Sequence, residues 1–464
     1  MYNKIEEFKK HIKNKKVAVL GIGVSNRPLI KFLHKAGADI TAFDRRDREG
    51  LADGLRELGE CDIKYSLGEG YLRGLNGFDV IFRTPGMRFD IPELVNAKNE
   101  GSEVTSEMEV FFELCPAEIF AVTGSDGKTT TTTLIYNMLK EEGYRCWLGG
   151  NIGIPLLGRV EEIAADDKVV LELSSFQLHT MDRSPHIAVI TNLSPNHLDV
   201  HKSMEEYVDA KKNIFRFQNK TDVLVLNHDN EITKCFKGEA NGEVKYFSRV
   251  NAVEKGCFVK DGSIVYKSGQ AEERIAEVGD IAIPGVHNIE NYLAAISAVI
   301  SYVSPETVRK VARSFKGVEH RIELVREVGG VKFYNDSIAS SPSRTIAGLN
   351  SFDKKVILIC GGKDKGIPYD DIGQPIADRV KVLVLIGATS GKIQRALKAA
   401  SERSGRGSDI PVFMCGTYEQ AVKTAYDNAQ EGDIVLLSPA STSFDMFKNF
   451  EERGKTFKKI VNSL

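Results

Sequence analysis

Residues 118–133 carry the side chains whose types and spacing are best suited to chemistry. They read Glu-Ile-Phe-Ala-Val-Thr-Gly-Ser-Asp-Gly-Lys-Thr-Thr-Thr-Thr-Thr, an apolar strand followed by a glycine loop and the start of a helix. Gly124 and Gly127 let backbone N–H groups approach phosphate oxygens, Lys128 brings a positive charge, and the Thr129 hydroxyl can reach Mg²⁺. The segment predicts a site for the triphosphate of ATP or GTP. Its binding residues are predicted to be Gly124, Ser125, Asp126, Gly127, Lys128, Thr129 and Thr130.

The loop departs from the usual eight-residue pattern at the first position. Val122 stands where that pattern has its first glycine. The strand–loop–helix context that supports a phosphate loop is nevertheless complete. The alternative is a plain strand-to-helix turn with an incidental lysine, and the sequence favours phosphate binding.

Glu172 ends the predicted strand Lys168-Val-Val-Leu-Glu. Beside a phosphate loop, a carboxylate at a strand end can hold Mg²⁺ together with the Thr129 hydroxyl. Taken alone, Glu172 could equally be a solvated or capping residue, but the neighbouring phosphate loop favours a role in binding Mg²⁺.

Two other polar residues carry weaker signals. His197 lies in a proline-containing loop after a strand, and imidazole is an unusual ligand for Mg²⁺, so its spacing alone favours a structural role. Lys211 lies in the helical run 204–215 and, taken alone, reads as a solvated helix lysine. Asn288 or Asn291 could cap a helix or present an amide to a purine. Arg321 could reach the triphosphate, with a surface arginine as the alternative.

A second glycine turn lies near the start of the chain. Lys16-Val-Ala-Val-Leu-Gly-Ile-Gly-Val-Ser enters a helical segment at about 28–36, and the next strand ends at Asp44. This unit is similar to a dinucleotide fingerprint, but Asn26 replaces the third glycine. NAD or FAD, a turn without a ligand, and another phosphorylated ligand at the same helix N-terminus all stay open, and the last is favoured.

The elements that must position these residues form three α/β stretches. At 464 residues the chain is long enough for about three domains of ~150 residues each. We expect a Rossmann-like domain over 1–106 and a central phosphate-loop domain over 107–317. The central domain should have a mostly parallel sheet and a small hairpin turning at Asp261-Gly262. The alternating strands and helices of 318–464 predict a second Rossmann-like, doubly wound domain.

Composition narrows the class of protein. Hydrophobic content of 42% and charged content of 27% are ordinary for a globular protein, and a net charge of −2 argues against a broad basic surface for nucleic acid or membrane. The seven cysteines never form a Cys-x-x-Cys pair, which favours reduced thiols. Neither a signal core nor an apolar run of ~18 residues is present. We expect a cytoplasmic monomer with no membrane span and no nucleic-acid partner.

Together these segments resemble the Mur ligases and their folylpolyglutamate synthetase relatives. The resemblance runs along the whole chain, and the pattern is closest to the members that add D-glutamate. The Asp-Asn-Pro-Arg segment of diaminopimelate-adding members is absent. The segments that carry the resemblance are Gly21-Ile-Gly-Val-Ser, Thr84-Pro-Gly, Thr123-Gly-Ser-Asp-Gly-Lys-Thr-Thr, Gly150-Asn-Ile-Gly, Glu172-Leu-Ser-Ser-Phe-Gln-Leu, Asn196-His-Leu-Asp, Gly285-Val-His-Asn-Ile-Glu-Asn, His320-Arg, Asn335-Asp-Ser and Ser438-Pro-Ala-Ser-Thr-Ser-Phe-Asp.

The resemblance implies roles that spacing does not. Lys128, Glu172, His197 and Lys211 would be the catalytic group. Thr129, Glu172, His197 and a carbamylated Lys211 would bind two Mg²⁺ ions. Nucleotide contacts would come from Asn291, Arg321 and Asp336, in addition to the phosphate loop. Substrate contacts would come from Val24, Ser25, Arg45, Asn151, Ser174, Gln177, Lys365, Ser443 and Phe444, of which the first three would hold a UDP group and the last three D-glutamate.

The implied reaction is ATP-dependent amide ligation in peptidoglycan precursor synthesis. ATP would phosphorylate the alanyl carboxylate of UDP-N-acetylmuramoyl-L-alanine, and the amine of D-glutamate would then displace phosphate. One departure is Ile338, which replaces a lysine that many members have after Asn-Asp-Ser, so its charge would come from Arg344 or Lys365. A related ligase with another amino acid, an oxidoreductase and a non-catalytic nucleotide-binding relative are the alternatives.

Overall fold

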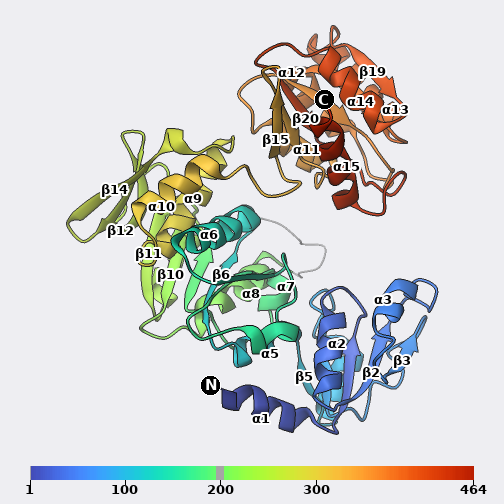
Figure 1. Cartoon of the computed structure of the whole chain (residues 1–464), viewed down its shortest axis with the longest axis vertical. Coiled ribbons are helices and arrows are strands. Elements are labelled where there is room, and N and C mark those ends of the chain that lie inside the picture. The colour runs from blue at the N-terminus through green and yellow to red at the C-terminus, as the bar shows by residue number, and fades with distance from the viewer. Residues whose placement is uncertain (1, 195–202) are drawn as a thin grey trace. The chain divides into compact units, whose positions relative to one another are not determined.

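The computed structural model describes residues 2–194 and 203–464 (Figure 1). These residues form three β-sheets, of five, nine and six strands, with helices between the strands along the chain. The chain divides into two compact units, Met1–Val278 with Glu290–Val311, and Gly279–Ile289 with Ala312–Leu464. The first two sheets belong to the first unit and the third sheet to the second. The predicted α/β class, with mostly parallel sheets, is confirmed.

The first sheet is entirely parallel, with the strand order β3-β2-β1-β4-β5. Val17 and Val19 of β1 cluster with residues of α1 and α2, whereas Ala18 and Leu20 cluster with residues of α4. The sheet is therefore covered on both faces, which explains its continuous apolar strands. Its elements are α1 Tyr2–Ile12, β1 Lys16–Leu20, α2 Asn26–Lys35, β2 Asp39–Asp44, α3 Ala52–Glu57, β3 Lys64–Leu67, β4 Val80–Phe82, α4 Pro92–Asn99 and β5 Glu103–Thr105.

The second sheet has the order β14-β13-β12-β11-β10-β9-β6-β8-β7 and is parallel from β7 to β12. Helix α6 packs against β6 to β8, and the apolar residues of α8 cluster with β6 from the other face. The elements up to β11 are α5 Glu107–Leu114, β6 Glu118–Thr123, α6 Lys128–Glu142, β7 Cys146–Gly150, the 3₁₀ turn Leu157–Glu162, β8 Lys168–Glu172, α7 Ser175–Leu178, β9 Ile187–Ile190, α8 Met204–Arg216, β10 Val223–Asn227, the 3₁₀ turn Thr233–Glu239 and β11 Glu243–Ser248.

The second sheet ends in an antiparallel extension, as the sequence predicted. Strands β12 Lys255–Lys260, β13 Ser263–Ser268 and β14 Ala271–Glu277 pair in antiparallel order. Asp261 and Gly262 both have left-handed backbone conformations, with φ of 49° and 77°, which a two-residue hairpin turn with Asp-Gly requires. The 3₁₀ turn Val278–Asp280 and helices α9 Val286–Val299 and α10 Pro305–Ser314 follow.

The third sheet has the order β15-β16-β20-β17-β18-β19, with only its β15–β16 pair antiparallel. Residues of α11, α12 and α13 cluster on one face, and residues of α14 and α15 on the other, as a doubly wound sheet requires (Figure 1). The elements are β15 Glu323–Val328, β16 Val331–Asn335, α11 Pro342–Leu349, β17 Val356–Cys360, the 3₁₀ turn Asp370–Ile372, α12 Gly373–Arg379, β18 Val380–Ile386, α13 Ser390–Ser404, β19 Val412–Cys415, α14 Tyr418–Asp427, β20 Ile434–Leu437 and α15 Phe450–Asn462.

No helix within the described residues has the length and apolar character needed to cross a membrane.

Candidate nucleotide and magnesium site

The loop between β6 and α6 is built around two glycines that no other residue could replace. Gly124 has φ +148°, and a Cβ atom there would lie 1.9 Å from the Thr191 hydroxyl oxygen. Gly127 has φ +77°, and its Cβ would lie 2.3 Å from Asn291 Oδ1. Both the backbone conformation and the close neighbours therefore demand glycine.

Residues after β9 hold this loop in place. The Thr191 hydroxyl donates to the Asp126 carbonyl at 2.6 Å. The Asp126 N–H donates to Asn192 Oδ1 at 3.0 Å, and the Ser125 N–H donates to the Asn192 carbonyl at 2.8 Å. Since these two loop N–H groups are engaged, the N–H groups of the first turn of α6, which have no partner within the helix, are the ones placed to receive phosphate.

Lys128 is the first residue of α6 and lies across the loop. Its ammonium donates to the carbonyls of Gly124 at 3.0 Å and Ser125 at 2.8 Å. The predicted phosphate-loop lysine is thus beside the loop that it should serve.

Glu172 and Thr129 meet at the carboxyl ends of β8 and β6, as the sequence predicted for a Mg²⁺ site. The Thr129 hydroxyl donates to Glu172 Oε2 at 2.7 Å, and the Asn151 amide donates to Oε1 at 2.8 Å. Glu172 is only 2% exposed, so the interpretation as a solvated carboxylate is wrong. The hydroxyl and carboxylate oxygens fit a hard cation such as Mg²⁺.

No group of three acidic, His or Cys side chains able to hold a metal occurs in the described part of the chain. Mg²⁺ is ordinarily held by one or two carboxylates together with substrate phosphates. His197, the other predicted Mg²⁺ ligand, lies outside the described residues.

Lys211 of α8 is buried at 1% exposure, so its interpretation as a solvated helix lysine is wrong. Its amine donates to the Thr123 hydroxyl at 3.0 Å and to the Gly124 carbonyl at 2.9 Å. Burial first, and then the positive charge of Lys128, lower the pKa of Lys211 well below its ordinary value, against the opposite effect of Glu172. Lys211 thus contacts the first residue of the phosphate loop, in surroundings that favour its neutral form.

Ser174 and Gln177, at the start of α7, are hydrogen-bonded to each other. Ser174 caps the helix by accepting from the Gln177 N–H at 3.3 Å, and Gln177 Oε1 accepts from the Ser174 N–H at 2.9 Å. This reciprocal capping box fixes both side chains at the carboxyl end of β8.

In the first glycine turn, Asn26 occupies the position of the third glycine of a dinucleotide fingerprint. Its amide donates to the carbonyls of Leu20 at 3.0 Å and Gly21 at 2.9 Å, which ties the turn to β1. Burial raises the pKa of Asp44, but hydrogen bonds from Arg46 and the Ile22 N–H outweigh it and bring that pKa down to about 2. Val24, Ser25 and Arg45 remain exposed around this turn.

Comparison with known proteins agrees with these observations. Three family models match: Mur ligase MurD-like N-terminal domain at residues 15–106, Mur ligase middle domain at 122–299, and Mur ligase glutamate ligase domain at 320–441. UDP-N-acetylmuramoylalanine–D-glutamate ligase of Acetivibrio thermocellus is 68% identical over 464 residues, covering 100% of both chains. The chain belongs to the Mur ligase family.

Other Mur ligases support the same conclusion. The enzyme of the same name from Ruminiclostridium cellulolyticum is 61% identical over 464 residues, again covering 100% of both chains. Among solved structures, a UDP-N-acetylmuramate–alanine ligase from Thermotoga maritima matches with a TM-score of 0.59 and 20% identity, covering 97% of this chain and 100% of that chain. That similarity shows the shared three-domain fold alone.

The remaining predicted site residues of this Mur ligase lie in the second unit. Asp336 is 4% exposed and accepts from the Ser438 hydroxyl at 2.8 Å. Burial raises the pKa of Asp336 to about 7, although the Ser438 hydrogen bond and the charge of Arg321 oppose it. Ser443 is buried, whereas Phe444 is 61% exposed and Lys365 is also exposed.

A fully buried guanidinium joins the loops that carry Asp336 and Ser443. Arg453 of α15 donates to the Ser337 hydroxyl at 2.9 Å and to the Ser337 carbonyl at 2.7 Å. It also donates to the Ser441 carbonyl at 3.0 Å. One side chain thus holds the loop after β16 to the loop after β20.

Several contributors to the site escaped the sequence analysis. Thr191 and Asn192 hold the phosphate loop, yet neither belongs to a motif that the sequence marks as functional. Thr123 lies in the phosphate-loop segment, but its contact with Lys211 gives it a role that the sequence did not predict. The available signal was their position. Each of the three residues is the last of a strand or follows a strand closely, at the carboxyl edge of a parallel sheet, where ligands bind.

Replacing Lys128 with alanine should lower the rate of ATP-dependent turnover by ~10²-fold or more, because a cation beside the transferring phosphoryl group is lost. Steady-state phosphate release measures this. Lys140→Ala, an exposed lysine at the other end of the same helix, is the matched control. A Lys128→Ala enzyme within a few-fold of the wild type would mean that the triphosphate binds elsewhere.

Asp336 should make the free energy of unfolding fall as pH rises from about 4 to 7, because its carboxyl keeps a proton in the folded state that the unfolded chain releases. The change from 3.8 to about 7 corresponds to about 4 kcal/mol at most. Asp336→Asn cannot ionise and should flatten this dependence in urea unfolding at pH 5 and pH 8. Asp353→Asn, at an exposed position, should leave it unchanged. Identical pH profiles for wild type and Asp336→Asn would contradict the assignment.

Proposed function

We propose that this Mur ligase joins D-glutamate to UDP-N-acetylmuramoyl-L-alanine with hydrolysis of ATP, in the synthesis of a peptidoglycan precursor. The observation that carries the proposal is the 68% identity, over the full length of both chains, to a UDP-N-acetylmuramoylalanine–D-glutamate ligase. The hydrogen bond between Thr129 and the buried Glu172, beside a glycine loop, supports the use of ATP and Mg²⁺.

The chemistry requires activation of a carboxylate, which is a poor electrophile. The alanyl carboxylate attacks the γ-phosphorus of ATP, the bond to the β–γ bridging oxygen breaks, and ADP leaves with that bond's electrons. The amine of D-glutamate then attacks the acyl phosphate, loses a proton and expels phosphate. Lys128 and the N-terminus of α6 lie where they would offset the charge of the transferring group.

Mg²⁺, when bound, would offset the negative charge that accumulates on the phosphates. Thr129 and Glu172 are the described residues that would hold it. We assign a second ion to His197 and a carbamylated Lys211.

The surroundings of the Lys211 amine support the proposed carbamylation. A neutral amine has two N–H bonds and a lone pair, and its hydrogens are directed at the Thr123 hydroxyl and the Gly124 carbonyl, at 3.0 and 2.9 Å. The lone pair is then available to bond the carbon of CO₂, with release of one proton to solvent. The product is an anionic oxygen ligand in place of an ammonium that would repel Mg²⁺.

Each unit carries its own substrate contacts in this proposal. In the first unit, Val24, Ser25 and Arg45 would hold the UDP group, Asn151, Ser174 and Gln177 the rest of that substrate, and Asn291 the nucleotide. In the second, Arg321 and Asp336 would contact the nucleotide, and Lys365, Ser443 and Phe444 D-glutamate. We further propose domain bounds of 1–106, 107–317 and 318–464, and a monomer that binds no nucleic acid.

Ile338 leaves one charge to be supplied from elsewhere. Arg344 is exposed, and its guanidinium donates to the Ile338 carbonyl at 3.3 Å, so a cation lies next to the residue that replaces the lysine of many relatives. This contact favours Arg344 over Lys365 as the replacement.

The purified protein should release phosphate only when ATP, Mg²⁺, UDP-N-acetylmuramoyl-L-alanine and D-glutamate are all present. Omission of each component in turn is the control, and mass spectrometry of the product confirms the amide. Equal turnover with meso-diaminopimelate or L-lysine would show that the chain is a Mur ligase of different amino-acid specificity.

Lys211→Ala should lose most ligase activity, and acetate or formate should partly restore it by placing a carboxylate in the vacated space. Lys212→Ala, a neighbour that pairs with Glu239 at 2.6 Å on the protein surface, should remain active and insensitive to these acids. Mass spectrometry of the intact wild-type protein under CO₂-rich and CO₂-free conditions gives an independent readout. A fully active enzyme with an unmodified lysine at 211 would refute carbamylation while leaving the ligase assignment standing.

A further inference from the structure

The turn that carries Arg321 has an unusual backbone. His320 and Ile322, on either side of Arg321, have φ of 64° and 44°, in the left-handed region that bulky residues rarely adopt. The Arg321 N–H donates to the Val318 carbonyl at 2.9 Å, which closes the turn. Such a conformation costs free energy and persists only when surrounding contacts hold it.

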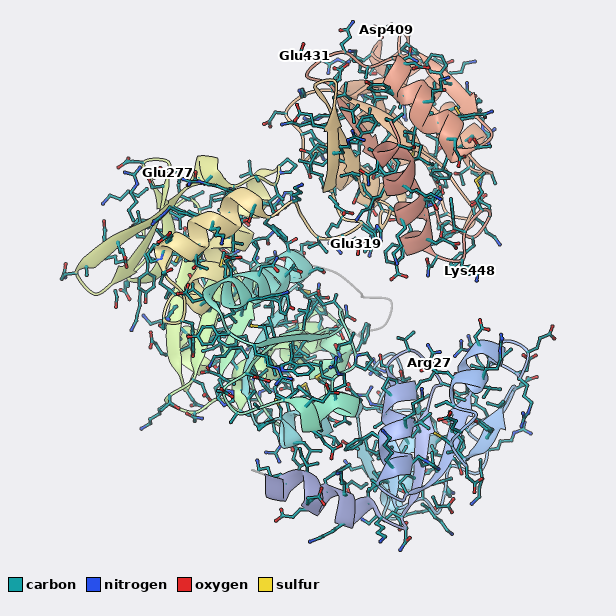
Figure 2. All side chains as sticks on the ribbon, in the orientation of Figure 1. Arg27, Glu277, Glu319, Asp409, Glu431 and Lys448 are labelled. Atoms are coloured by element: carbon teal, nitrogen blue, oxygen red, sulfur yellow. The ribbon has the colours of Figure 1, made fainter. Side chains whose placement is uncertain are left out.

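One face of α15 supplies those contacts. Phe450, Gly454 and Lys458 are spaced four residues apart and therefore lie on one side of the helix. The Phe450 ring meets the His320 ring edge-on, with centroids 6.0 Å apart. Lys458 forms ion pairs with Glu319, at 3.1 Å, and with Glu323. Figure 2 shows Glu319 at the opposite end of segment 312–464 of the second unit from Asp409 and Glu431.

Gly454 is where the helix comes closest to the turn. A Cβ atom at this position would lie 2.2 Å from His320 Nδ1 and 2.7 Å from Cε1. The backbone of α15 therefore packs directly on the imidazole ring, and any larger residue would displace it.

His320 has little freedom to move away. It is 4% exposed, its N–H donates to Glu323 Oε2 at 3.0 Å, and its Nδ1 lies 2.9 Å from the Asn335 amide nitrogen. Its carbonyl accepts from the Ile338 N–H at 3.1 Å. His320 is thereby tied to both sides of the loop that contains Asp336.

The turn is also coupled to Asp336 directly. The positive charge of Arg321 acts on the Asp336 carboxyl group and opposes the effect of its burial on the pKa. A shift of His320 would alter both flanks of Arg321 and its relation to Asp336.

We propose that Gly454 is a positioning residue for the nucleotide: without a side chain, it lets α15 hold His320 in place and so fixes Arg321 relative to Asp336. This inference rests on the proposed nucleotide contacts of Arg321 and Asp336. It adds to them a residue far from both in the sequence, one that would not itself touch ATP.

The test is Gly454→Ala, with the dissociation constant for Mg·ATP measured by calorimetry and the KM for each substrate measured by phosphate release. We expect kcat/KM for ATP to fall by about 10²-fold, as small misplacements of binding groups do, with a weaker Mg·ATP affinity. The KM for UDP-N-acetylmuramoyl-L-alanine should stay within a few-fold of the wild type. Gly391→Ala is the matched control, since Gly391 lies in helix α13 and its Cβ would meet no atom closer than 3.5 Å.

A double-mutant cycle separates positioning from general damage. In an Arg321→Ala background, Gly454→Ala should cause little further loss in ATP affinity, because both changes act through the same group. Equal losses in both backgrounds, or an unchanged ATP affinity in Gly454→Ala, would overturn the proposal.

Lys458→Gln covers the case in which Gly454→Ala does not fold. It removes the ion pairs to Glu319 and Glu323 without adding bulk, and should weaken Mg·ATP binding in the same direction, again only while Arg321 is present. No change on Lys458→Gln would then overturn the proposal. A wild type that binds Mg·ATP but makes no product with D-glutamate would refute the proposed function instead, because the calorimetric cycle needs no amino acid.

Discussion

The site depends on close contacts between the glycine backbone and neighbouring residues at the carboxyl edge of the second sheet. Cβ atoms at Gly124, Gly127 and Gly150 would lie 1.9, 2.3 and 2.2 Å from Thr191, Asn291 and the Glu172 carbonyl. Since no side chain fits at these points, β6, β8, β9 and α9 can meet around one small volume. Glu172, Lys128 and Lys211 are brought together within this close packing.

Charge is distributed unevenly around that volume. Glu172 is buried with both oxygens hydrogen-bonded, and Lys211 is buried beneath the loop beside the charge of Lys128. Two lysines so near one another cannot both be charged at low cost in a desolvated place. The pKa of Lys211, the more deeply buried of the two, is accordingly lowered well below its ordinary value.

Sequence reasoning predicted the elements well where a local pattern decided them. The strand–loop–helix at residues 118–133, the Asp261-Gly262 hairpin and the alternation in the third domain all appear as predicted. Spacing alone failed for Lys211, which only the family resemblance marked as functional, because a helical lysine looks the same whether its face meets water or a loop distant in the sequence. The supports of the phosphate loop at Thr191 and Asn192 were missed for the same reason, since strand pairing brings them there and no motif marks them.

Arg453 has a consequence for the order in which the molecule is made. Arg453 joins two loops, one at Ser337 after β16 and one at Ser441 after β20. The guanidinium comes from α15, which follows every other described element of that domain in the sequence. Domains form as units while the chain leaves the ribosome. The nascent third domain must therefore wait for its final helix before these two loops can be fixed, and until then its polar loop groups stay hydrated rather than buried.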